Sequence, residues 1–167
     1  MNLQTERISF RRYGDVDFEF LHSLLSDPEM VLYIGEGKTR DREGTRTFLE
    51  WIYHTYSTGQ AFGLMVLENR STKSPIGHAG LVPQMINGRE EIEIGYWISK
   101  EYWGAGYATE AAKSLMVYGR GLGINRFIAL IQPENTGSKK VADKLGMTLE
   151  SEIVLSGQKV QVHSVSW

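Results

Sequence analysis

The feature that most constrains the fold of this chain is a strand, a helix and a second strand in its middle. The stretch EEIEIGYWIS (residues 90–99) alternates apolar and polar side chains, which predicts a half-buried strand. A helical segment with small and apolar residues on one face follows, and the apolar run RFIALI (126–131) then predicts a fully buried strand. Such a unit crosses over with a right hand and predicts a local parallel pair.

The segments on either side of this unit predict antiparallel pairing. The expected elements are a strand at RISFRRY (7–13), a helix capped by Asp15 and ending near Asp27–Pro28, a helix from about Asp41 to Ser57, strands FGLMVLE (62–68) and PIGHAGLV (75–82), a turn at INGRE (86–90), a helix from about Thr136 to Leu145, and a hairpin of TLESEIVL (148–155) and KVQVHSV (159–165). The order is β-α-α-β-β-β-α-β-α-β-β. We expect an α/β fold of the mixed α+β kind, with a mostly antiparallel sheet flanked by helices, in one domain over residues 1–167.

Composition argues against several classes of function. The chain has 18 Lys and Arg against 20 Asp and Glu, a net charge of -2, which disfavours a broad basic face for nucleic acid. It has no Cys, which excludes thiolate metal sites and a cysteine nucleophile, and its four His fall in different elements, so no metal site is expected. No run approaches the ~20 apolar residues that span a membrane, and the polar N-terminus is unlike a signal peptide. We expect a cytoplasmic protein without nucleic-acid or membrane partners.

The sequence WGAGYA (103–108) places two glycines where a helix is expected to open, near Ala105. The first turn of a helix has unpaired N–H groups and a partial positive charge, and glycines let a ligand approach the backbone closely. These properties suit a phosphate or pyrophosphate, while a plain strand-to-helix turn is the alternative. A dinucleotide fingerprint is excluded, because Thr109 stands at its third glycine position and no acid ends the next strand.

WGAGYA resembles the pyrophosphate-binding signature of the GNAT superfamily of acyl-CoA-dependent N-acyltransferases. That signature is Gln or Arg, two residues, Gly, one residue, then Gly or Ala; Gly106 and Ala108 match it, and Trp103 replaces the Gln or Arg. The longer stretch EIGYWISKEYWGAGYATEA (93–111) is similar to the RimJ/RimL-like branch. A second block, NTGSKKVADKLGM (135–147), resembles the family's Asn-x-x-Ser…Lys-Leu-Gly-Phe segment, with Met in place of Phe.

The resemblance implies that acetyl-CoA is the co-substrate and lies in a cleft between the strands at 90–99 and 126–131. It implies that backbone groups of the strand at 90–99 contact the pantetheine arm. It also implies that main-chain amides of the glycine turn bind the pyrophosphate. The implied cofactor-binding residues are Trp97, Ile98, Ser99, Trp103, Gly104, Ala105, Gly106, Tyr107, Ala108, Thr109 (through its hydroxyl) and Asn135.

The resemblance also implies two catalytic residues. Glu93 matches the strand glutamate that accepts the proton of the amine, with Glu91 as the alternative; a solvated strand face is the other interpretation of both. Ser138 matches the serine that RimL-like enzymes place near the sulfur, and an ordinary residue in the first turn of a helix is the other interpretation of it. The position of the family's usual tyrosine acid is Ala142 here. Because a cysteine nucleophile is excluded, we expect direct attack in a ternary complex.

The predicted function is therefore transfer of an acetyl group to a primary amine, either a small molecule or a protein N-terminus. The alternatives are a catalytically silent acyl-CoA-binding module and a transferase that uses another donor, such as succinyl-CoA. In the family, the acceptor is contacted by segments that correspond to Gly35–Gly44 and Ser156–Gln158. We expect a monomer or a homodimer.

Overall fold

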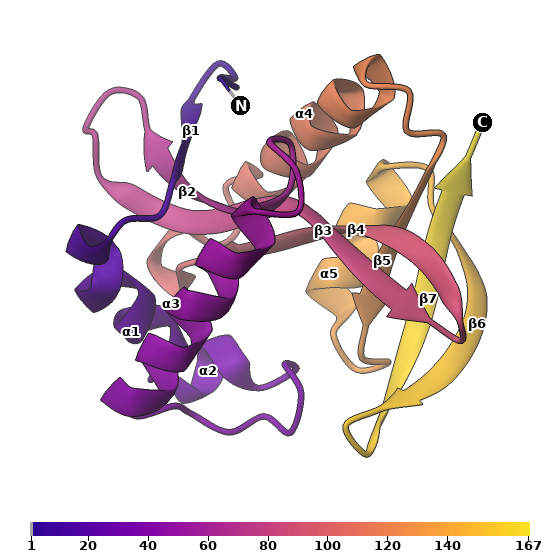
Figure 1. The fold of residues 1–167 in the computed structure, drawn as a ribbon, viewed down its shortest axis with the longest axis horizontal. Helices are drawn as coiled ribbons and strands as arrows, with labels where there is room; N and C mark the ends of the chain where they lie inside the picture. Colours follow the sequence, from indigo (N-terminus) through magenta and orange to yellow (C-terminus); the bar gives the residue numbers. More distant parts are fainter. Residues whose placement is uncertain (1) are drawn as a thin grey trace.

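A computed structural model describes residues 2–167 and shows a seven-stranded sheet in the order β1-β2-β3-β4-β5-β7-β6 (Figure 1). The strands are β1 (Ile8–Arg12), β2 (Gly63–Asn69), β3 (Pro75–Ile86), β4 (Arg89–Ile98), β5 (Arg126–Ile131), β6 (Thr148–Leu155) and β7 (Gln158–Ser166). The helices are α1 (Phe18–Leu25), α2 (Pro28–Val31), α3 (Arg42–Tyr56), α4 (Tyr107–Gly121) and α5 (Thr136–Lys144), with 3₁₀ turns η1 (Asp15–Asp17) and η2 (Lys100–Tyr102). Neighbouring strands are antiparallel except β4 and β5, which are parallel, so the predicted fold class is confirmed.

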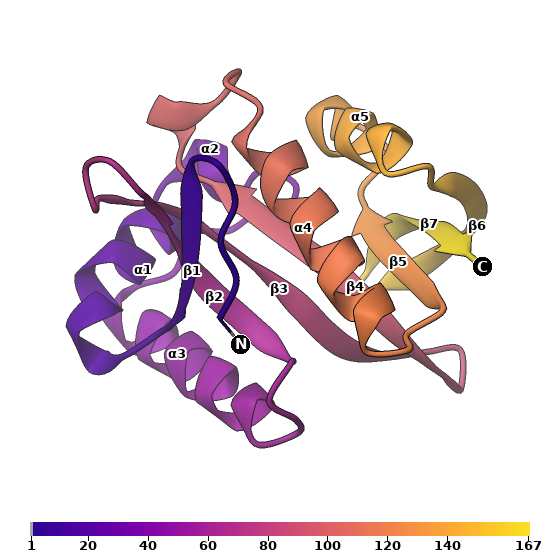
Figure 2. The ribbon, with the colours of Figure 1, turned by 90° about the horizontal axis from the view of Figure 1, so that it is seen from above.

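Helices cover both faces of the sheet, as Figure 2 shows: α1 and α3 lie on one side, and α4 and α5 on the other. The α4 side holds the larger core, in which Leu115 and Phe127 are fully buried. The α3 side holds a second core around Leu21, Leu49 and Ile52. These two layers bury the alternating faces of the central strands, as the period-two pattern of the sequence predicts.

The helix boundaries differ from the prediction in three places. The short helix α2 was not predicted; Asp27 caps it by accepting a hydrogen bond from the backbone of Glu29, and Pro28 occupies its first position. Asp15 does not cap the first helix, because η1 intervenes and the carboxylate of Asp15 accepts a hydrogen bond from the hydroxyl of Tyr53 instead. The helix expected near Ala105 begins at Tyr107, because the glycine turn continues for two more residues.

The strands β4 and β5 are paired at a single position and then separate. Glu93 is opposite Ile128, and this is the one parallel pair recorded along the two strands within residues 2–167. On its other edge β4 pairs with β3 along its whole length, and β5 pairs with β7 along its whole length. The backbone of β4 beyond Glu93 is therefore exposed at an open edge that faces β5, and unpaired backbone groups at such an edge favour a bound partner.

Candidate active site

The open edge of β4 is one wall of a cleft of about 630 Å³. The other walls come from α2 and the segment after it, the turn before α4, the first turn of α4, β5 and the start of α5. All of the predicted site residues line this cleft except Ser99 and Ala105; those that do are Glu93, Trp97, Ile98, Trp103, Gly104, Gly106, Tyr107, Ala108, Thr109, Asn135 and Ser138. The fold thus brings together two motifs that are about thirty residues apart in the sequence.

The backbone groups of β4 that face this cleft include those of Ile98 but not those of Trp97 and Ser99, the other two residues predicted at this end of the strand. The amide of Ser99 donates to the carbonyl of Ile76 on β3 at 2.9 Å. Because hydrogen-bonded and non-hydrogen-bonded positions alternate along an antiparallel pair, Trp97 also directs its backbone toward β3, and Tyr96 and Ile98 direct theirs toward β5. The groups at the open edge therefore belong to Tyr96 and to Ile98, whose carbonyl also accepts a hydrogen bond from the Trp103 side chain.

The glycine turn leaves the N-terminus of α4 without a side-chain cap. Gly104 and Gly106 have φ angles of 79° and 82°, in the left-handed region that favours glycine. Gly106 is the N-cap of α4, and no side chain accepts a hydrogen bond from the N–H groups of the first turn. A 15-residue helix that begins with uncapped N–H groups at the wall of a cleft is suited to bind an anion.

Trp103 joins this turn to the end of β4. Its indole N–H donates to the carbonyl of Ile98 at 2.6 Å, and about half of the residue is exposed. The indole has one donor, and that donor is already used. Trp103 therefore does not present to the turn the polar group that a Gln or Arg would present at this position.

Glu93 is half-buried at the point where β4 and β5 separate. Its Oε1 accepts a hydrogen bond from the side-chain amide of Gln84 at 2.9 Å. Burial raises the pKa of Glu93 above the ordinary range, and the hydrogen bonds from Gln84 and from the Leu130 backbone oppose this rise only in part. A carboxylate with a raised pKa is a stronger base than an exposed one.

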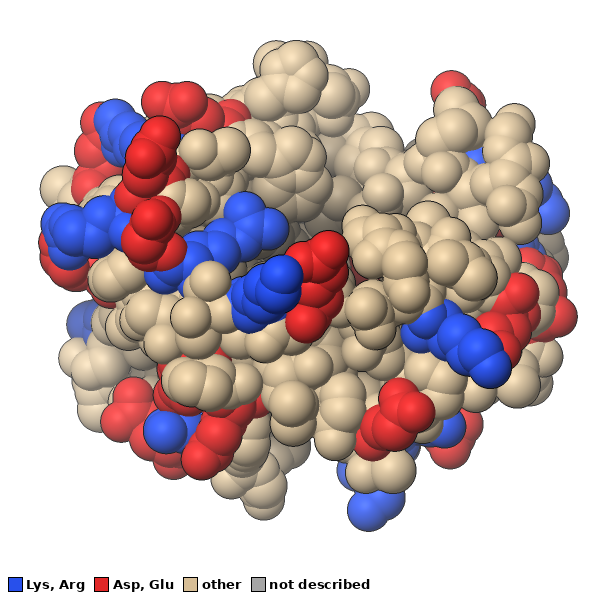
Figure 3. Space-filling view, turned by 90° about the horizontal axis from the view of Figure 1, so that it is seen from below, with Lys and Arg blue, Asp and Glu red and all other residues tan. Residues whose placement is uncertain are grey.

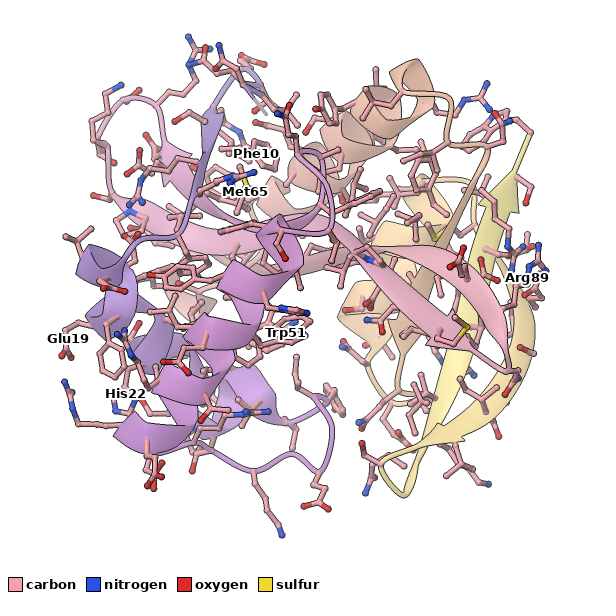
Figure 4. All side chains as sticks on the ribbon, in the orientation of Figure 1. Phe10, Glu19, His22, Trp51, Met65 and Arg89 are labelled. Carbon is pink, nitrogen blue, oxygen red and sulfur yellow. The ribbon has the colours of Figure 1, made fainter. Side chains whose placement is uncertain are left out.

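Glu91, the alternative base, lies two residues away on the same strand but has a different environment. Arg126 of β5 donates to its two oxygens at 2.8 and 2.9 Å, and Arg126 also binds Glu150. Glu91 is buried and is not among the residues that line the cleft. Its other cationic neighbour, Arg89, is at the β3–β4 hairpin, on the side of the molecule away from α1 and α3 (Figure 4). The geometry of Glu91 is that of a buried ion pair between strands.

Asn135 and Ser138 form a local pair at the start of α5. Asn135 is the N-cap: its Oδ1 accepts from the Ser138 amide at 3.2 Å, and its Nδ2 donates to Ser138 Oγ at 3.0 Å. Since Ser138 Oγ accepts this bond, its own hydroxyl hydrogen remains available to a group in the cleft. The hydroxyl of Tyr96 donates to the Ser138 carbonyl at 3.0 Å and fixes β4 against α5.

A second cavity, of about 310 Å³, adjoins this cleft. Trp97 and Ile34 line both spaces. The second cavity brings part of the predicted acceptor segments together, since its lining includes residues between Gly35 and Arg40 and also Ser156. The face of the molecule drawn in Figure 3 has a hollow near its middle, with basic and acidic side chains beside it.

The remaining findings concern metals and membranes. Within residues 2–167, no group of three or more His, Cys, Asp or Glu side chains is placed to hold a metal ion. His22, on α1, instead shares a hydrogen bond of 2.8 Å with Thr45 of α3 (Figure 4). None of the helices in the described part of the chain has the length and apolar character needed to cross a membrane.

A mixed sheet that opens between two parallel strands, beside an uncapped helix N-terminus and a half-buried carboxylate, suits a transferase that binds an extended anionic donor. Residues 7–148 match the family model described as "Acetyltransferase (GNAT) domain". The chain therefore belongs to the GNAT acetyltransferase family and is an acetyl-CoA-dependent acetyltransferase.

Individual relatives agree with this assignment. YkkB of Bacillus subtilis, an uncharacterized protein, is 37% identical over 87% of this chain and 84% of its own length. The uncharacterized N-acetyltransferase p20 of Bacillus licheniformis is 35% identical over 89% of this chain and 83% of its own. The crystal structure of a GNAT-family acetyltransferase from Bacillus anthracis has a TM-score of 0.82 and 28% identity, and the match covers 99% of this chain and 98% of that one.

Proposed function

We propose that this acetyltransferase transfers the acetyl group of acetyl-CoA to a primary amine by direct attack in a ternary complex. One observation carries the proposal: Glu93 and the glycine turn line a single cleft, and a second cavity meets that cleft at Trp97 and Ile34. An extended donor and a separate acceptor therefore each have a space, and the proposed base is in the cleft that holds the donor.

The cleft fits acetyl-CoA, which supplies an acetyl thioester when it is bound. Main-chain amides of Gly104, Ala105, Gly106, Tyr107 and Ala108, with the hydroxyl of Thr109, would hold the pyrophosphate. The Trp103 amide, which was also predicted to do so, already donates to the Lys100 carbonyl at 3.1 Å. The backbone groups of Tyr96 and Ile98 would hold the pantetheine arm at the open edge, and the second amide hydrogen of Asn135 is available to the same arm. Trp97 is assigned to the wall between the two cavities.

Glu93 accepts the proton of the attacking amine in this proposal. An amine of pKa ~8 to 10 is mostly protonated at neutral pH, so a base within the cleft raises the fraction able to react. Ser138 is proposed to donate its hydroxyl hydrogen to the departing thiolate, since Asn135 holds Oγ as an acceptor. Gln84 and Asn135 are positioning residues, because they act through Glu93 and Ser138.

The acceptor is proposed to be a protein N-terminus or a small amine that enters through the second cavity. The apolar side chains that line this cavity include Leu25, Val31 and Trp97, and its charged side chains are Glu36, Lys38 and Arg40. Such a site suits an amine attached to an apolar body. The RimJ/RimL-like motif favours the N-terminal amine of a protein.

The test is an acceptor panel read by the release of CoA thiol. The chain has no Cys, so a thiol reagent reports CoA alone. Short peptides with free and blocked N-termini, amino acids and polyamines are compared, with acetyl-CoA and succinyl-CoA as donors. We expect thiol release only with a free amine and with acetyl-CoA. Binding of CoA without release for any amine would contradict the proposal and would support a silent module.

We also propose that residues 1–167 form one domain and that the protein is a monomer or a homodimer. The two cores share the central strands of one sheet, so a single cooperative unfolding transition is expected. Light scattering after gel filtration measures the mass; a value above two chains contradicts the second statement.

A further inference from the structure

The segment before β1 is bound to the first turn of α4 by one carboxylate. Glu110 accepts hydrogen bonds from the hydroxyl of Thr5 at 2.6 Å, from the backbone N–H of Arg7 at 3.2 Å and from Nε of Arg7 at 2.8 Å. The guanidinium of Arg7 also lies over the ring of Tyr107, at 4.1 Å from its centre. The Arg7 side chain is thus held from two sides by residues of the first turn of α4.

This arrangement places the outer end of Arg7 at the glycine turn. A Cβ atom built on Gly106 would lie 3.6 Å from Nη2 of Arg7, and no other atom beyond its chain neighbours would lie within 4 Å. Glu110 uses the Nε atom, and neither Nη1 nor Nη2 has a hydrogen-bond partner within residues 2–167. The two Nη groups carry donors that an anion at the N-terminus of α4 can use.

The residues that line the cleft supply no cation for such an anion, whereas Arg7 is beside this lining, at Gly106. That lining, within the described residues, includes neither Lys nor Arg. Trp103 occupies the signature position of Gln or Arg, and its N–H is bound to Ile98. The backbone amides of the turn would then face a pyrophosphate without any positively charged side chain from the motif itself.

We propose that Arg7, from outside the motif, supplies this cation and is a pyrophosphate-binding residue. The inference rests on the proposed function, since it requires acetyl-CoA at the glycine turn. Glu110 and Tyr107 are positioning residues that hold the guanidinium beside Gly106. The competing interpretation is that Arg7 and Glu110 form a structural pair that attaches the N-terminal segment to α4.

The test is calorimetric titration with CoA of the wild type, Arg7→Met and the matched control Arg12→Met. Arg12 is on β1 and its guanidinium also lies over a tyrosine ring (Tyr56, at 4.6 Å), but no atom of Arg12 is within 4 Å of a Cβ built on Gly106. Loss of a charge-assisted hydrogen bond predicts about 10- to 100-fold weaker CoA binding for Arg7→Met. Arg12→Met is expected to bind like the wild type. Equal affinity of all three proteins overturns the inference and leaves the proposed function intact, whereas a wild type that does not bind CoA refutes the proposed function itself.

Two further measurements separate a phosphate contact from a structural role. Turnover of S-acetyl-N-acetylcysteamine, which has no phosphate, is expected to be unchanged by Arg7→Met; a parallel loss contradicts the inference. The double variant Arg7→Met with Glu110→Gln removes the carboxylate left without its partner. We expect it to bind CoA as weakly as the single variant, and restored binding would show that repulsion by Glu110 caused the loss.

The phosphate group involved is identified with 3′-dephospho-CoA, which keeps the pyrophosphate. Arg7→Met is expected to weaken the binding of 3′-dephospho-CoA by the same factor as the binding of CoA. If Arg7→Met binds 3′-dephospho-CoA as tightly as the wild type does, Arg7 contacts the 3′-phosphate and the proposal is refuted. If Arg7→Met melts at a lower temperature, Arg7→Gln makes the same comparison, because its amide can still donate to Glu110 while the charge is gone.

Discussion

Replacing Glu93 with Gln removes the proposed base and keeps the size of the side chain, so two effects can be measured in one variant. A general base contributes about 10²- to 10⁴-fold, and we expect kcat to fall by that amount with any amine acceptor. The stability of Glu93→Gln is expected to increase, whereas its kcat decreases. Because burial raises the pKa of Glu93, the ionised side chain is disfavoured in the folded state at neutral pH, and the neutral amide is not.

The sign of this effect depends on pH. A carboxyl group with a raised pKa in the folded protein stabilises the fold below its unfolded pKa of ~4.3, and this contribution is lost as the pH rises through the folded value. Glu93→Gln is therefore expected to unfold at a higher temperature than the wild type at pH 7. The difference should disappear at a pH below about 4.

Glu91→Gln is the matched control, two residues away on the same strand. It weakens the hydrogen bonds of 2.8 and 2.9 Å from Arg126 and is expected to cost about 1.5 kcal/mol, or roughly 3–6 °C in melting temperature for a domain of this size. Its kcat should remain close to that of the wild type. Calorimetric melting and steady-state kinetics measure both quantities. Loss of turnover in Glu91→Gln with retention in Glu93→Gln would refute the assignment of the base.

Three further predictions concern the surroundings of the site and the cores. Gln84→Leu removes a hydrogen bond worth about 1 kcal/mol, so Glu93 should bind its proton about fivefold more tightly, as measured by carboxyl NMR titration; no change would contradict its positioning role. Gly119→Ala places a Cβ 2.7 Å from a buried aromatic ring of β5 and should lower the free energy of unfolding, measured in urea, by about 1–3 kcal/mol. The matched variant Gly121→Ala, whose Cβ has nothing within 4 Å, should leave this free energy unchanged or raise it. Burial lowers the pKa of His78 to about 3. As the pH falls from 6.5 to 3, the free energy of unfolding of the wild type should therefore decrease by up to about 1.4 kcal/mol per pH unit, and His78→Gln should lack this contribution.

The sequence predicted the order of the elements because each has a distinct local signal. Alternation predicted β4, the apolar run predicted β5, and the Asn87–Gly88 turn, with φ angles of 51° and 76°, closes the β3–β4 hairpin at the expected place. The length of β3 was underestimated, since it continues four residues beyond the predicted end at Val82. These four residues are held in the strand by pairing with β4, and a local sequence pattern does not report such pairing.

The site was predicted from its motifs, but the contacts among its residues were not. Glu91 and Glu93 look alike in the sequence, and only the position of Arg126 on a distant strand distinguishes them. Tyr96 alternates with Ile94 and Ile98, and the sequence contains no local signal that it lines the cleft, because this depends on the separation of β4 from β5. Arg7 gave no signal, since its proximity to Gly106 depends on the packing of the N-terminal segment against α4.

The most direct test of the account is calorimetric titration of acetyl-CoA into the wild type, Gly106→Glu and Gly123→Glu. The two substitutions introduce the same charge at glycines with positive φ angles, 82° and 89°, at opposite ends of α4. The account predicts that the wild type and Gly123→Glu bind alike, and that Gly106→Glu binds at least about 100-fold more weakly, because its carboxylate occupies the anion site. Equal binding by the two variants, or no binding by the wild type, would contradict the claim that the glycine turn holds the pyrophosphate.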